Sequence, residues 1–135
     1  MAVACAACAG PGTSDSAQIT RGESSKFTEA EIESAESATM EKFKDFRGCD
    51  LLWLEYDEVT SNRLVEDYIE YGGGAESNVD PGNAIAFQSE FRVGNNAEAS
   101  LNPNTEYTYS WTLIRDGKSS PWEVVSYGYW GVPAR

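Results

Sequence analysis

Two cysteines three residues apart, Cys5 and Cys8, are the first residues of the chain whose spacing could serve chemistry. A C-x-x-C pair can be a redox couple, half of a metal site or part of a lipid-attachment signal. A redox couple needs a helix terminus or a cation that lowers a thiol pKa, whereas this pair precedes a Gly-rich stretch. A structural zinc site needs four ligands, and the chain offers one further cysteine, Cys49, and no histidine. We therefore predict no metal and no cofactor.

The lipid-attachment interpretation fits the surroundings of both cysteines. Small residues precede each of them, and residues 9–25 are rich in Gly, Ser and Thr, which is typical of a flexible tether. We predict that residues 1–25 combine the remnant of a lipoprotein signal with a tether, and that Cys5 or Cys8 carries the lipid. If Cys5 carries it, Cys8 remains free to reach Cys49. The expected location is the extracellular face of a bacterial membrane.

The alternative location is the cytoplasm. A secretion signal contains about 7 to 15 apolar residues before its cleavage site, and only Ala2, Val3 and Ala4 separate Met1 from Cys5. If Met1 is the true start, the lipoprotein interpretation fails and the cytoplasmic location stands.

Charge and hydropathy limit the partners. The chain carries 22 acidic and 10 basic residues, for a formal net charge of −12. Such a field repels nucleic-acid phosphates and anionic lipid surfaces. No run approaches the ~18 apolar residues of a membrane-spanning helix. We predict no nucleic-acid partner, and membrane contact only through a lipid anchor.

The absence of histidine also narrows the catalytic chemistry. It excludes Ser-His-Asp and Cys-His nucleophile pairs and the usual general base near neutral pH. Catalysis would have to use carboxylates, and Asp57 and Glu58, beside Tyr56, are the candidates. Paired carboxylates work as acid and base when they face each other across a cleft, which spacing along the chain does not show. A solvated acidic rim is the simpler interpretation, so a non-enzymatic role is favoured.

The elements that position these residues are expected to begin near Phe27. Thr28 and Glu31 have the spacing of a capping box, and an apolar stripe with helical period then runs to Gly48, a C-terminal cap. The stripe consists of Ile32, Ala35, Thr39, Phe43 and Phe46. Residues 49–58 predict a short buried strand, and residues 61–71 predict a second helix that three glycines stop.

The final third of the chain predicts three strands. Residues 84–93 alternate apolar and polar side chains, the pattern of a half-buried strand. Residues 105–115 and 122–130 should pair as an antiparallel hairpin, with a turn signal at Asp116 and Gly117. This order of elements predicts one α+β domain over residues 26–132. We expect both helices to lie on one face of a curved antiparallel sheet, with a cone-shaped cavity between the layers.

Aromatic residues are too numerous in the last two strands for one helix layer to cover, because both faces of these strands are expected to carry them. The excess should line a pocket or an exposed binding face. The residues predicted to line that pocket are Trp53, Tyr56, Tyr68, Tyr109, Trp111 and Tyr127.

Four stretches of the sequence resemble a known family. They are FTEAEIESA, FRGCDLLWLEYDE, LNPNTEYTYSWTLIRDGK and PWEVVSYGYW, which lie within residues 27–130. They resemble a group of small lipoproteins from Gram-positive gut bacteria whose fold is nuclear-transport-factor-2-like, also called cystatin-like. The resemblance implies that fold and carries over no catalytic residue.

The sequence therefore favours a surface-tethered, non-enzymatic domain that binds a small molecule or a peptide through an aromatic-lined pocket. The alternative is a carboxylate-based hydrolase or isomerase that uses Asp57 or Glu58 inside the cone. A third hypothesis is a homodimer formed through the open face of the sheet.

Overall fold

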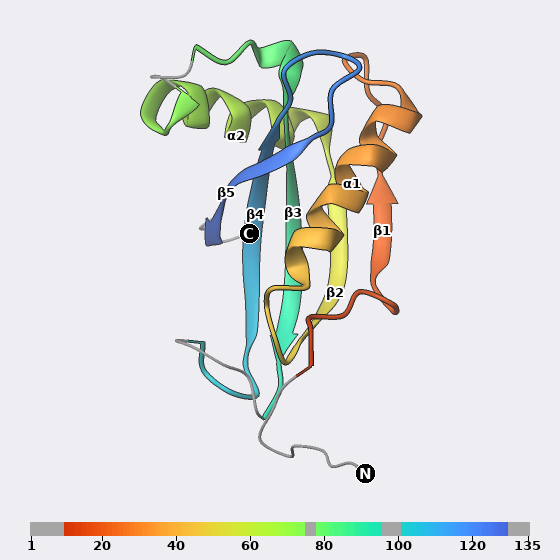
Figure 1. Ribbon diagram of the computed structural model, residues 1–135, viewed down its shortest axis with the longest axis vertical. Coiled ribbons are helices and arrows are strands. Elements are labelled where there is room, and N and C mark those ends of the chain that lie inside the picture. The colour runs from red at the N-terminus through yellow and green to blue at the C-terminus, as the bar shows by residue number, and fades with distance from the viewer. Residues whose placement is uncertain (1–9, 75–77, 96–100, 130–135) are drawn as a thin grey trace.

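The computed structural model describes residues 10–74, 78–95 and 101–129, which form a mixed α+β domain (Figure 1). Two helices pack on a curved, open, five-stranded sheet of order β1-β2-β3-β4-β5, in which only β1 and β2 run parallel. The elements are β1 (Gln18–Arg21), α1 (Glu29–Phe43), β2 (Cys49–Tyr56), α2 (Glu58–Tyr71), the 3-10 turn η1 (Pro81–Asn83), β3 (Ala84–Val93), β4 (Glu106–Ile114) and β5 (Glu123–Tyr129). The α+β prediction and the three consecutive antiparallel strands are confirmed.

Helix α1 forms where the capping box predicted it. The Thr28 side chain accepts a hydrogen bond from the Glu31 N–H, and the Glu31 carboxylate accepts one from the Thr28 N–H. The apolar stripe from Ile32 to Phe43 is buried. The helix ends at Phe43, however, and not at Gly48. Residues 44–48 form turns, and Gly48 adopts a φ of 82° as the chain enters β2.

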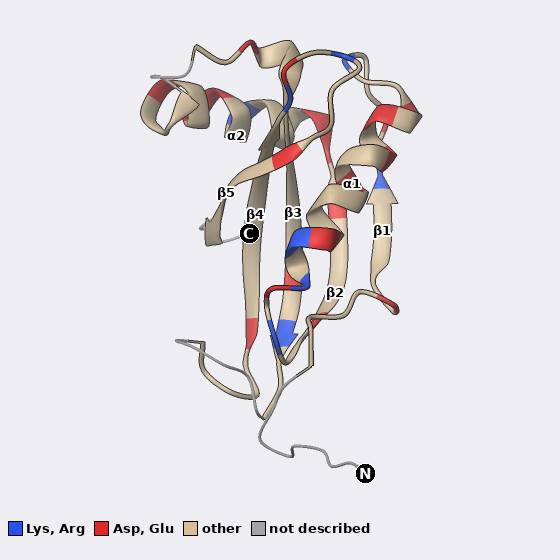
Figure 2. Ribbon diagram, in the orientation of Figure 1, with Lys and Arg blue, Asp and Glu red and all other residues tan. Residues whose placement is uncertain are grey.

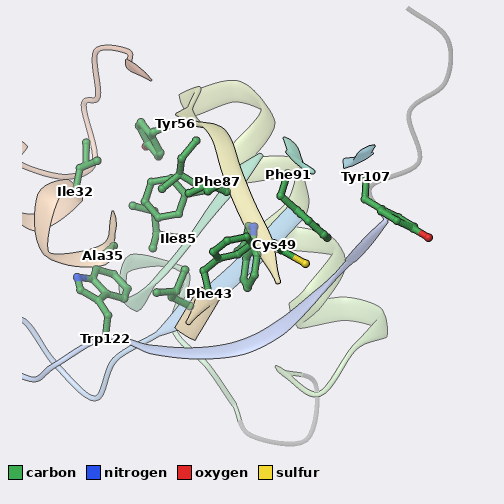
Figure 3. Close-up of a cluster of buried hydrophobic side chains, with 14 of the residues drawn as sticks. Ile32, Ala35, Phe43, Cys49, Tyr56, Ile85, Phe87, Phe91, Tyr107 and Trp122 are labelled. Carbon is green, nitrogen blue, oxygen red and sulfur yellow. The ribbon is translucent and has the colours of Figure 1, made fainter. Parts of the chain in front are cut away.

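The two helices lie on opposite faces of the sheet, so the prediction that both cover one face is wrong. Alternate residues of β3 and β4 point to α1 and join the main core, which includes Ile85, Phe87, Trp111 and Leu113 (Figure 3). The residues between them point the other way, where Val65 of α2 packs against a second, smaller cluster. That cluster contains Val65, Ala84 and Ala86, with Leu64, Ile69, Val79 and Ile114 packed against it.

The change of face follows from the end of β2. Strand β2 stops at Tyr56, and Asp57 caps α2, which begins at Glu58 and so incorporates residues predicted as the end of the strand. Beyond the last β2–β3 pair, the buried Ala86 N–H donates instead to the Ser61 hydroxyl of α2, at 2.9 Å. The small side chains of Ala84 and Ala86 let the helix pack close to the strand.

One end of the main core is closed around Arg115, whose side chain is only 3% exposed. Its guanidinium lies 2.9 Å from the Glu31 carboxylate and donates to Asn83 Oδ1 at 3.2 Å. It also lies 4.5 Å from the Trp122 ring, which contacts Phe27 edge to face. The Thr28 N–H, and then Arg115, lower the pKa of Glu31. This cluster joins the start of α1 to η1 and to the β4–β5 connection.

The segment predicted as a flexible tether is partly folded onto the domain, so the expectation that order begins near Phe27 is wrong. Within it, β1 pairs with β2 from Gln18↔Trp53 to Arg21↔Tyr56. Arg21 then reaches α1, where its Nε donates to the buried Glu36 carboxylate at 2.8 Å. Strand β1 has only four residues, too few to show a convincing alternation in the sequence.

Residues upstream of β1 are fastened to the loop between α1 and β2. The Gly48 N–H donates to the Gly10 carbonyl at 2.9 Å, and the Gly12 N–H donates to the Lys44 carbonyl at 3.0 Å. Thr13 continues the contact, since the Leu51 N–H donates to its carbonyl at 2.8 Å. Gly12 lies so close to this loop that a Cβ would overlap the Phe43 carbonyl oxygen and lie 2.8 Å from that of Phe46.

We predict that Gly12→Ala displaces residues 10–14 and lowers the free energy of unfolding by about 1–3 kcal/mol. Urea titration measures the loss, and hydrogen exchange of the Leu51 amide, which is bonded to Thr13, should accelerate. Gly10→Ala is the matched control, because its Cβ would meet nothing within 4 Å. Equal stability of the two variants would contradict the close packing of Gly12.

Candidate functional site

The two candidate catalytic carboxylates each hold a neighbouring segment of backbone. Asp57 caps α2, and its Oδ2 accepts a hydrogen bond from the Thr60 N–H at 3.0 Å. Glu58 binds Ser25 by accepting from its N–H at 3.0 and 3.1 Å and from its hydroxyl at 2.9 Å. Both residues lie at the surface where α2 begins, and these hydrogen bonds give each of them a structural role.

The six residues predicted to line a pocket lie in four different places. Tyr109, Trp111 and Tyr127 come together, with ring centroids 6.2 Å apart for Tyr109–Tyr127 and 5.2 Å apart for Trp111–Tyr127. Tyr56 is buried towards the other end of the core, its hydroxyl 3.2 Å from Ser24 Oγ. The other two are outside this core.

Trp53 lies on the opposite face of the sheet, where its indole N–H donates to Glu90 Oε1 at 2.9 Å. Tyr68 lies on α2, against the glycines at 72–74. Trp111 is fully buried. The six residues therefore do not form one pocket, and of the six only Tyr109 and Tyr127 remain as candidates for an exposed aromatic contact on the α1 side of the sheet.

Four grooves on the described part of the chain, of about 320 to 480 Å³, border α1 or the β4–β5 connection. The groove of about 420 Å³ lies between residues 21–24 and the first turns of α1, beside the Arg21 ion pairs. None of these four grooves is lined by the six predicted residues or by Asp57 and Glu58. Nor do His, Cys, Asp and Glu gather into a metal site anywhere in the described ranges.

A partly exposed aromatic cluster lies where the α1 side of the sheet extends past the helix. We define the aromatic surface as Phe46, Tyr107, Tyr109, Tyr127 and Tyr129. Phe46 contacts Tyr127 at 5.3 Å between ring centroids, and Tyr129 contacts Tyr109 at 5.8 Å and Tyr107 at 5.9 Å. Tyr127 and Tyr129 are 48% and 70% exposed. Figure 3 shows Tyr107 at the edge of the buried cluster, its hydroxyl directed away from the core.

The surface lies beyond the end of α1, which is shorter than the central strands β3 and β4. A helix of 15 residues spans about 22 Å, whereas the 10 residues of β3 span about 33 Å. The aromatic residues of β4 and β5 all lie on this one side, since Tyr107, Tyr109 and Trp111 alternate along β4 and Tyr127 and Tyr129 pair with Trp111 and Tyr109. For the described residues of β4 and β5, the expectation that both faces carry aromatic residues is therefore wrong; Trp130, which that expectation included, lies outside the described residues.

Three members of the aromatic surface, Phe46, Tyr107 and Tyr129, are absent from the predicted pocket. The period-2 spacing of the tyrosines in β4 and β5 was the signal for two of them. Phe46 gave no such signal, because it belongs to the predicted helical stripe and lies in the turn after α1.

Two titratable groups in and beside this surface, the Tyr109 phenol and the Cys49 thiol, have raised pKa values. Burial raises the pKa of the Tyr109 phenol, and the neighbouring phenols of Tyr129, Tyr107 and Tyr127 raise it further. Burial raises the pKa of the Cys49 thiol to about 11. A thiol this protonated is a poor nucleophile, in keeping with a buried packing role for Cys49. Cys5 and Cys8 lie outside the described residues.

A model of the family described as "Domain of unknown function (DUF4829)" matches residues 19–128, which run from β1 to β5. No curated protein and no solved structure matches the chain. Among the described helices, none has the length and apolar character needed to cross a membrane.

The structural role of Asp57 predicts a specific mutational pattern. Asp57→Ala should lower the free energy of unfolding by about 1 kcal/mol, and Asp57→Asn should be close to wild type, because asparagine caps helices as well as aspartate does. Thermal or urea unfolding measures both variants. An Asp57→Asn variant as unstable as Asp57→Ala would show that the carboxylate charge, and not the cap, is required.

Proposed function

We propose that this chain, which belongs to the DUF4829 family, is a surface-tethered, non-enzymatic binding domain that contacts its partner through the aromatic surface. The observation that carries the proposal is the exposure of Tyr127 and Tyr129 above a packed aromatic base. Tyrosine combines a large apolar ring with a polar tip, so it contributes strongly to binding surfaces.

Catalysis has weaker support than binding. Asp57 and Glu58 hold backbone groups at the start of α2, on a different element from the aromatic surface. An acid or base that serves catalysis is expected in a cleft with a perturbed pKa. The carboxylate-based hydrolase or isomerase therefore has no observation in its favour.

Tethering is proposed through a lipid on Cys5 or Cys8, which would place the domain on the extracellular face of a bacterial membrane. Such a tether would be shorter than the composition of residues 9–25 suggests, because the Gly10 carbonyl accepts a hydrogen bond from the Gly48 N–H. A residue adds at most about 3.6 Å to the chain. Cys8 therefore lies within about 7 Å of Gly10 along the backbone, and the domain would stay close to its anchor.

We extend the proposal to the nuclear-transport-factor-2-like fold. Its support is a sheet that curves around α1: Arg21 of β1 binds Glu36 of α1, and Val124 of β5 lies in a groove with Ala38 of the same helix. Both edges of the sheet thus reach one helix. The position of α2 on the opposite face sets this chain apart from the arrangement we expected for that fold.

Lipid attachment is tested by metabolic labelling. The natural gene, expressed with the codons upstream of Met1 in a Gram-positive host, should incorporate an alkyne-bearing fatty acid that is detected by click chemistry. Cys5→Ala or Cys8→Ala should abolish the label, whereas Cys49→Ala, the control, should retain it because Cys49 is buried. Unlabelled wild-type protein, or label that survives in the double variant, would refute the tether.

Use of the aromatic surface is tested by photo-crosslinking in the same cells. p-Benzoylphenylalanine in place of Tyr129 should give crosslinked products upon irradiation. The same amino acid in place of Tyr71 should not, although Tyr71 is 78% exposed, because it lies at the end of α2. Mass spectrometry of the products identifies the class of partner. Equal yields at the two positions, or none at position 129, would count against a binding role.

A further inference from the structure

We propose that the partner of the aromatic surface is the lipid bilayer to which the chain is tethered, with Tyr127 and Tyr129 at the level of the headgroups. This inference rests on the lipid attachment proposed above and adds a second membrane contact to it. Three observations support it: the position at which the chain enters the domain, the chemistry of the surface and the distribution of charge.

The chain enters the domain beside the aromatic surface. Gly10 is bonded to Gly48, and Gly12 lies against the backbone of Phe46. The Phe46 ring in turn contacts Tyr109 at 6.0 Å and Tyr127 at 5.3 Å. The loop that receives the N-terminal segment therefore also supplies one ring of the surface.

The length of chain before Gly10 limits how far a lipid could lie from this point. At most about 7 Å of backbone separates Gly10 from Cys8, and about 18 Å separates it from Cys5. A lipid on either cysteine would hold the end of the domain that carries Phe46 against the membrane. The α2 end, at the opposite end of the sheet from the loop between α1 and β2, would point away (Figure 1).

The residues of the surface suit a membrane interface. Tyrosine is enriched at the boundary between hydrocarbon and water, because its ring is apolar and its hydroxyl remains hydrated. Tyr127 and Tyr129 alternate on the same side of β5 and are both exposed, so their rings can enter the interface together. The charged residues next to the surface in sequence are Asp45 and Arg47, which flank Phe46, and Glu106, which precedes Tyr107 and pairs with Arg92.

The charge distribution favours the same orientation (Figure 2). Residues 41–50, which surround Phe46, balance three acidic side chains, Glu41, Asp45 and Asp50, with three basic ones, Lys42, Lys44 and Arg47. Nearby, Arg92 of β3 pairs with Glu106 of β4.

Residues 55–70, at the α2 end, are strongly acidic by comparison. They carry one basic residue, Arg63, against six acidic ones: Glu55, Asp57, Glu58, Glu66, Asp67 and Glu70. An anionic membrane would repel this end more strongly than the Phe46 end.

A weak contact suffices because the tether makes it intramolecular. A short linker gives an effective concentration in the millimolar range, so a surface with little affinity of its own can still be occupied. This accounts for a net charge of −12 in a membrane-facing domain. The untethered protein would be repelled by an anionic surface, and the tethered one would lie on it.

The experiment uses the full chain carrying Cys5→Ala, coupled through Cys8 to vesicles that contain a maleimide-bearing lipid. Cys49 does not compete, because it is buried and its thiol pKa is about 11. The vesicles consist of phosphatidylcholine with a minority of phosphatidylglycerol and a gadolinium-chelating lipid. Tyrosines are replaced biosynthetically by 3-fluorotyrosine, and fluorine NMR measures the paramagnetic broadening of each signal, assigned by Tyr→Phe variants.

The signals of Tyr127 and Tyr129 should broaden several-fold more than that of Tyr71, which is more exposed than either but lies on α2. Broadening of Tyr71 that matches or exceeds theirs would overturn the proposal. Tyr107, at the edge of the same surface, should also broaden more than Tyr71, and in the double variant Tyr127→Ser/Tyr129→Ser this excess should disappear. Val59→Ser, which removes an exposed apolar side chain from α2, is the matched control and should leave the pattern unchanged.

This test separates the inference from the proposed function. Chemical coupling replaces biological lipidation, so successful fatty-acid labelling together with uniform broadening would refute the membrane contact and leave the tethered binding domain standing. Failed labelling would remove the premise of both. A protein or glycan crosslinked at position 129 in cells would also overturn the bilayer as occupant, whereas a lipid crosslinked there would support it.

Discussion

The organisation of this domain depends on how one helix covers an aromatic sheet face. Tyr107, Tyr109, Trp111 and Leu113 alternate along β4, so they all face α1, and β3 and β5 add rings on the same side. Helix α1 buries the part of this face near Trp111 and leaves the part near Tyr129 in contact with solvent. Helix α1 spans about 22 Å and β3 spans about 33 Å, so part of this sheet face extends beyond the helix.

The second helix, α2, does not cover the exposed part of this face, because it packs on the other face of the sheet. Its direction is set locally: Asp57 starts the helix directly after Tyr56, Ser61 satisfies the Ala86 N–H, and the alanines of β3 accept Val65. Arg115, Trp122 and Phe27 close the main core at the α1 start. The core is therefore sealed at one end by a buried cation and left aromatic and partly exposed at the other.

Local signals predicted the parts of the fold that depend on neighbours in sequence. The Thr28–Glu31 spacing located the start of α1, and alternation located β3 and the final hairpin. Two features that depend on residues distant in the sequence were not predicted: strand β1 and the face of the sheet that α2 covers. Strand β1 is held by its pairing with β2 and by the hydrogen bond from Arg21 to Glu36. Nothing in the sequence marks these two residues as partners. The face chosen by α2 depends on Ser61 and Ala86, which carry no hydrophobic pattern.

The exposed aromatic residues differ from those predicted because the sequence does not show where α1 stops covering the sheet. Aromatic residues alone did not distinguish Trp111, which is fully buried, from Tyr129, which is 70% exposed. The difference arises where α1 ends, and that end is also where Gly12 packs against the carbonyls of Phe43 and Phe46. A side chain at position 12 would push the N-terminal segment away from the loop that carries Phe46. The close approach at Gly12 therefore fixes both the point at which the chain enters the domain and its nearness to the exposed tyrosines.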